Sequence, residues 1–175
     1  MKENFKTSSS TVNKFQILVG VAVLFVGALV YLIDRPPGQT YFIYKSSINI
    51  SLHSILPNLF GIIGNSLPAF IHVFSLILMT AGIISCRKSD YLIICVSWFI
   101  VDCTFELGQK FSTWSVKLIP DWFTEIPFLE NSQNCFLQGT FDILDLAAIA
   151  LGTVAAYLML LTTNRRKQRH GERKE

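Results

Sequence analysis

Four long blocks of apolar residues constrain this chain more than any other feature of its sequence. Of its 175 residues, 51% are hydrophobic and only 15% are charged. Lipid offers no partner to backbone N–H and C=O groups, so a chain crosses the hydrocarbon core of about 30 Å as a helix of roughly 20 apolar residues. The sequence therefore predicts an all-α polytopic membrane protein with four transmembrane helices, at residues 16–33, 67–86, 91–109 and 141–162.

Lysine and arginine residues are distributed unevenly among the segments that flank these blocks. Eleven of the 15 lie in an N-terminal arm (1–15), in the short turn at 87–90 and in the C-terminal tail (163–175). Because cytoplasmic loops carry the excess of basic residues, both termini and this turn are predicted to be cytoplasmic. A basic run directly after a span is typical of a contact with anionic lipids, and we do not expect the tail to bind nucleic acid.

The two segments on the opposite side, 34–66 and 110–140, are long and unusually apolar for loops. The first contains an apolar run at 47–60, which we expect to lie on the outer leaflet or to dip into it. The second contains Trp114 and Trp122, which are typical of an interfacial aromatic belt, and the segment could also act as a lid. The first span lacks a small-residue cleavage site, so we interpret it as a retained signal anchor of a cell-membrane protein.

Six polar side chains lie within the last three predicted spans or at their ends. An ionisable group inside a span costs several kcal/mol unless it is paired or hydrated, so such residues are functional candidates. Their spacing of i, i+4 and i+7 on the third span, and of i and i+3 on the fourth, places each set on one helix face. The helical rise predicts a similar outer depth for all of them. We therefore predict an outward-facing ligand pocket lined by His72, Asp102, Glu106, Gln109, Asp142 and Asp145.

Some of these residues have a structural interpretation as well. Asp142 and Asp145 lie at the start of the fourth span, where a carboxylate complements the positive end of the helix dipole. His72 could simply be hydrogen-bonded to a neighbouring helix. The face that carries the two aspartates continues as a ridge of small residues four apart, which is predicted to pack closely against another helix: Ala148, Gly152 and Ala156.

The order of these residues resembles the VanZ-like family of small membrane proteins. The resemblance covers roughly residues 68–160: Glu106-x-x-Gln109 at a helix end, then a loop, then the run 139–145 with its two aspartates, with His72 in the preceding helix. It implies an envelope-associated role, since the namesake is linked to resistance to a glycopeptide antibiotic, but it supplies no established reaction. Family members commonly carry an Arg shortly before the first aspartate and an Asn after it, and neither is found at the corresponding positions here.

No motif indicates a cofactor or a soluble-enzyme mechanism. The four cysteines lack CxxC spacing, and the chain has no P-loop, dinucleotide fingerprint, GxSxG or HExxH motif, so no cofactor is expected. Cys103 and Cys135 could form a disulfide, although membrane cysteines are more often apolar fillers.

Three functions remain open, and whether the protein is an enzyme is undecided. The favoured one is binding of a polar head group or a cell-envelope precursor. The second is metal-dependent catalysis on lipids or peptide bonds by the carboxylates and His72. The third is proton-coupled transport through Asp102 and Glu106.

Overall fold

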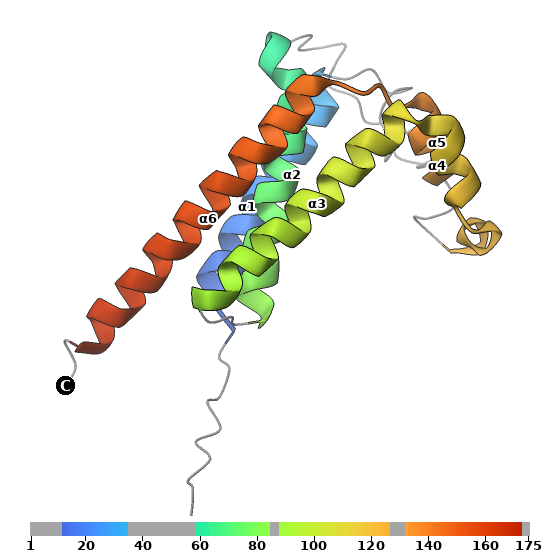
Figure 1. The fold of residues 1–175 in the computed structure, drawn as a ribbon. Coiled ribbons are helices and arrows are strands. Elements are labelled where there is room, and N and C mark those ends of the chain that lie inside the picture. Colours follow the sequence, from blue (N-terminus) through green and yellow to red (C-terminus); the bar gives the residue numbers. More distant parts are fainter. Residues whose placement is uncertain (1–11, 35–58, 85–87, 127–131, 173–175) are drawn as a thin grey trace, which may run out of the picture.

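The computed structural model describes residues 12–34, 59–84, 88–126 and 132–172, which are helical over most of their length and contain no strand (Figure 1). The helices are α1 (Lys14–Asp34), α2 (Gly61–Ile84), η2 (Lys88–Asp90), α3 (Tyr91–Lys110), α4 (Ser112–Leu118), η3 (Asp121–Glu125), α5 (Ser132–Gln138) and α6 (Ile143–Glu172). Four stretches are long and apolar enough to cross a membrane: Lys14–Asp34, Ile63–Ile84, Lys88–Lys110 and Ile143–Thr163. The prediction of an all-α, multi-pass membrane protein is confirmed.

The start of α2 differs from the sequence-based prediction. It begins at Gly61, six residues before the predicted start at residue 67, and it continues through Pro68. The cause is a contact that is distant in sequence: both carboxylate oxygens of Asp34, the last residue of α1, accept a hydrogen bond from the backbone N–H of Phe60, at 3.2 and 3.4 Å. A carboxylate at a helix N-terminus is favourable because it faces unsatisfied N–H groups and the positive end of the dipole.

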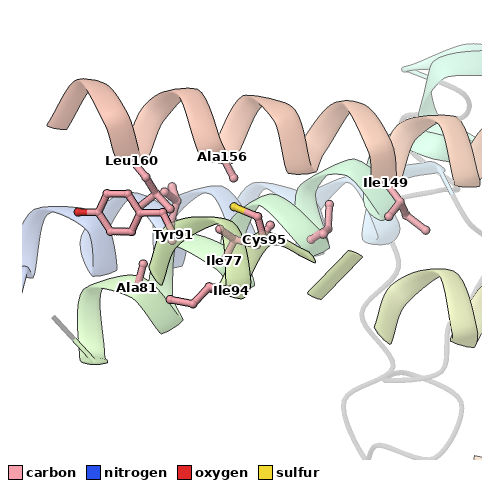
Figure 2. Packing of buried hydrophobic residues seen from close by; sticks show 10 residues of the cluster. Ile77, Ala81, Tyr91, Ile94, Cys95, Ile149, Ala156 and Leu160 are labelled. Carbon is pink, nitrogen blue, oxygen red and sulfur yellow. The ribbon is translucent and has the colours of Figure 1, made fainter. Parts of the chain in front are cut away.

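The bundle is organised around α2, which packs against α1, α6 and α3. Two glycines of α1 allow this helix to approach α2 closely: a Cβ at Gly20 would collide with Met79, and one at Gly27 would collide with Ile71. On its other sides α2 contributes to an apolar core shared with α3 and α6. Figure 2 shows this cluster, with Ile77 and Ala81 from α2, Tyr91, Ile94 and Cys95 from α3, and Ile149, Ala156 and Leu160 from α6.

The small-residue ridge of α6 is packed inside the bundle, as predicted, and at Gly152 its neighbour is α2. Ala148, Gly152 and Ala156 are all buried. A Cβ at Gly152 would lie 2.6 Å from a methyl group of Val73 and 2.7 Å from the carbonyl oxygen of Phe70. The two backbones are therefore in close contact at this point, which only a glycine permits.

The start of α1 and the last turns of the fourth span lie at the same end of the bundle, here termed the inner end. The Gln16 side-chain amide donates to the Thr163 hydroxyl at 3.0 Å, and the Asn13 backbone N–H donates to the Gly82 carbonyl at 2.9 Å. The opposite end, where α1 ends and α2 begins, is termed the outer end. An even number of spans follows from this arrangement, whereas the assignment of the inner end to the cytoplasm stays a prediction.

A small helical unit made of α4, η3 and α5 projects sideways from the outer end of α3, away from α6 (Figure 1). It is held to α3 by the stacked rings of Phe105 and Phe136, 5.7 Å apart, and by a hydrogen bond of 2.9 Å from the Ser115 hydroxyl to the Gly108 carbonyl. Trp114 and Trp122 are exposed on it. The structure thus gives this segment regular helices where the sequence predicted a loop, while its contact with the membrane interface stays a prediction.

Other predicted segments fall outside the described residues or only partly within them. The apolar run at 47–60 is described only from residue 59, and the basic arm only from residue 12. The backbone of α6 extends into the basic tail as far as Glu172. Cys103 is a free, half-buried thiol, so the disulfide that the sequence left open is not formed.

Candidate functional site

The most unusual polar contact of the bundle joins α2 to α3 within the apolar spans. Nδ1 of His72 lies 3.3 Å from Oδ1 of Asp102. The Asp102 side chain is only 7% exposed, whereas the His72 side chain is 56% exposed. The second oxygen of Asp102, Oδ2, is buried and has no hydrogen-bond partner among the described residues. The structure therefore contains a buried carboxylate that holds a partly exposed imidazole.

This contact determines which edge of the imidazole is available. A neutral imidazole has one N–H donor and one nitrogen with a free lone pair. Because Nδ1 faces a carboxylate oxygen, the contact assigns the proton to Nδ1 and leaves Nε2 as the acceptor. A carboxylate on one ring nitrogen fixes the orientation of the ring. His72 thus combines a fixed ring orientation with a side chain that is more than half exposed.

A second pair lies closer to the outer end and joins α3 to the start of α6. The carboxylate of Glu106, which is 7% exposed, accepts a hydrogen bond of 2.8 Å from the backbone N–H of Asp142. The Asp142 carboxylate in turn accepts from the backbone N–H of Leu144 at 2.9 Å, and its carbonyl accepts from the N–H of Asp145 at 3.1 Å. Asp142 is therefore the N-cap of α6. The structural interpretation of this aspartate is confirmed.

The remaining two candidates lie near this outer pair. Gln109 is half-buried three residues after Glu106, and Asp145 is half-buried in the first turn of α6. The ammonium group of Lys110 lies 4.8 Å from the centroid of the Phe141 ring, which brings one basic residue to the same end of the bundle. Further polar groups thus lie at the same end of the bundle as the outer pair, most of them at helix ends.

The depths of the candidates differ from the prediction of one common outer level. His72 is eleven positions after Gly61, or about 16 Å along the axis at 1.5 Å per residue, so it lies near the middle of α2. Asp102 lies eight positions before the end of α3 at Lys110, about 12 Å from it. The predicted depth of His72 was too shallow because α2 starts earlier than predicted. The structure brings four of the six candidates together as two pairs, His72 with Asp102 deep in the bundle and Glu106 with Asp142 nearer the outer end.

Several polar contacts between helices were not predicted as such. The indole N–H of Trp98 donates to the Thr80 hydroxyl at 3.0 Å, and Gln16, only 2% exposed, bonds to Thr163. Each lies toward the inner end. The sequence indicates that Gln16 needs a hydrogen-bond partner, because it is an amide near the start of an apolar span. It does not indicate which residue that partner is.

The described residues contain no group of three or more His, Cys, Asp or Glu side chains that could hold a metal ion. In comparisons with protein-family models, with curated proteins and with solved structures, none matched this chain. The resemblance to the VanZ-like family therefore stays a prediction from the sequence. What the structure supports is a multi-pass membrane protein with an oriented His72–Asp102 pair inside its spans.

Proposed function

We propose that this protein binds the polar head group of a lipid or of a cell-envelope precursor, and that the His72–Asp102 pair recognises it. The observation that carries this proposal is the contact of 3.3 Å between a buried carboxylate and an imidazole that is more than half exposed. Polar groups inside a span are costly, and a purely structural pair would be expected to bury both partners. The imidazole of His72 is instead more than half exposed, and in this proposal its second ring nitrogen contacts the ligand.

The envelope setting rests on the resemblance to the VanZ-like family, and with it the assignment to the cell membrane. Glu106 and Asp142 belong to the family pattern, and here their contact joins the outer ends of α3 and α6. In this proposal they maintain the shape of the site, while His72 contacts the ligand. A metal-dependent enzyme would need a set of metal ligands that the described residues do not contain.

The test measures ligand retention by the purified full-length protein. The protein is extracted in a mild detergent, incubated with a total lipid extract of the producing cells, and examined by native mass spectrometry for bound species. We expect a bound component that H72F and D102N lose by about tenfold or more, equivalent to at least 1.4 kcal/mol. S97A is the matched control, because Ser97 is an exposed polar residue of α3, the helix of Asp102, and lies outside the pair. Equal retention by all four proteins would refute the proposal.

A further inference from the structure

The exposure of His72 is unusual because of its depth. Its side chain is 56% exposed, yet it lies near the middle of a helix that is apolar enough to span the membrane. A side chain at that depth can be exposed only in two ways. It can face a water-filled space open toward one end of the bundle, or it can face sideways toward the bilayer.

The neighbouring turns decide between these two directions. On the outer side, the residue one turn above His72 on α2 is Pro68, which is buried, and the residue one turn above Asp102 on α3 is Glu106, which is 7% exposed and bonded to the start of α6. The outer side of the pair is thus filled by protein, and His72 is not exposed through it.

The inner side of the pair is also occupied. One turn below His72 on α2 is Leu76, which is half-buried, and one further turn below is Thr80. Thr80 accepts the hydrogen bond of 3.0 Å from Trp98 of α3, so the two helices are joined there. With protein above and below, the exposed part of the imidazole faces sideways, out of the bundle.

From this geometry we infer that the site opens laterally to the bilayer, and that its ligand is an uncharged lipid whose small head group carries a hydroxyl. This inference rests on the proposed function and names the ligand class. It replaces the outward-open pocket expected from the sequence with one that a lipid enters from the membrane.

The charge of the ligand follows from the groups that surround the pair. Asp102 and Glu106 are both carboxylic acids on the same face of α3, one turn apart. Within each of the four spans, the chain has no lysine or arginine except in the first or last turn. A phosphate at His72 would therefore lie beside the Asp102 carboxylate, with Glu106 one turn away, and would meet only one potential cation, His72. A hydroxyl instead donates to the free lone pair of Nε2 and requires no counter-charge.

The size of the head group follows from the depth. The hydrocarbon core is about 30 Å thick, so a group near the middle of a span lies about 15 Å below the head-group region. Moving a charged phosphate to that depth is costly, whereas one hydroxyl group has a much smaller desolvation penalty that the imidazole offsets. A diacylglycerol meets both requirements, and it is the probe for the test.

The first experiment measures the direction of exposure. In full-length protein whose native cysteines are replaced, a nitroxide label is attached at H72C, at I100C and at I77C, and the proteins are reconstituted in lipid nanodiscs. Ile100 is an exposed apolar residue of α3, and Ile77 is fully buried. Electron paramagnetic resonance then compares the accessibility of each label to oxygen, which concentrates in lipid, with that to a water-soluble nickel chelate. We expect the label at position 72 to resemble that at position 100. Higher accessibility to nickel, or protection as at position 77, would overturn lateral opening.

The second experiment tests the ligand class with native mass spectrometry of the wild-type protein and H72F. Diacylglycerol is compared with its 3-acetyl ester, which lacks the hydroxyl donor, and with phosphatidic acid, in which a phosphate replaces the hydroxyl. We expect diacylglycerol to bind about tenfold more tightly than either, and H72F to abolish this preference. Equal binding of the three lipids would overturn the inference. If the wild type still retains a His72-dependent component of the total lipid extract, only the ligand class is wrong; if H72F changes neither result, the proposed function fails too.

Discussion

Substitution of Gly152 tests the close packing of α6 against α2, on which the geometry of the site depends. A Cβ at this position would be 2.6 Å from the Val73 methyl group and 2.7 Å from the Phe70 carbonyl oxygen. Ordinary contacts between carbon atoms lie at about 3.5–4.0 Å, so the two helices would have to separate by about 1 Å. Val73 is fully buried and the second contact is with backbone, so neither group can move aside easily. Overpacking of this kind typically costs about 1–3 kcal/mol.

The assay is thermal unfolding of the purified protein in detergent. At about 2–4 °C per kcal/mol for a chain of this size, G152A should lower the Tm measurably, and G152L should lower it further because its side chain adds three more carbon atoms. The matched control is A147L, since Ala147 is exposed on the same helix and its substitution adds the same side chain without a collision. If G152L and A147L have the same Tm as the wild type, α6 does not pack against α2 as described.

Three further predictions concern the two ends of the bundle. E106A should destabilise the protein by about 1–3 kcal/mol because it leaves the half-buried N–H of Asp142 without its acceptor. E106Q retains an acceptor oxygen and should cost less; the Tm values of the two variants check this. Q16L and T163V should each cost about 0.6 kcal/mol, and the double variant less than their sum, because they break the same hydrogen bond; a double-mutant cycle with strictly additive losses would show that the bond contributes nothing. A reporter enzyme that is active only in the cytoplasm should be active when it is fused after Glu175. Activity of a reporter that works only outside the cytoplasm would contradict the predicted orientation.

The four spans could be predicted from the sequence because the bilayer imposes a simple requirement. Backbone groups must be satisfied within each segment, so a long apolar block without a nearby alternative becomes a helix. The boundary that differed most is the start of α2. Gly61, Gly64 and Pro68 are typical of a loop, and what allows the helix to begin at Gly61 is the carboxylate of Asp34 on the preceding helix. Nothing in the local sequence indicates that contact.

The candidate site was predictable in its residues but not in its pairing. Ionisable groups in apolar segments are visible in any sequence, and the shared face of Asp102 and Glu106 follows from helical spacing. Which partner each one meets depends on the crossing of α2, α3 and α6, and so on close contacts such as the one at Gly152. The sequence therefore indicated the residues of the site, whereas the structure shows which of them are in contact: His72 with Asp102, and Glu106 with Asp142.

The two carboxylates of α3 show how the partner of a buried acid decides its role. Glu106 meets a backbone N–H at the start of α6, and the favourable interaction with that helix end satisfies it within the fold. Asp102 meets an imidazole that has a second ring nitrogen and whose side chain is more than half exposed. The first contact closes the outer end of the bundle, and the second leaves hydrogen-bonding capacity that only a further group can use. Because both acids lie on one face of the same helix, closing the outer end and orienting His72 depend on the same placement of α3.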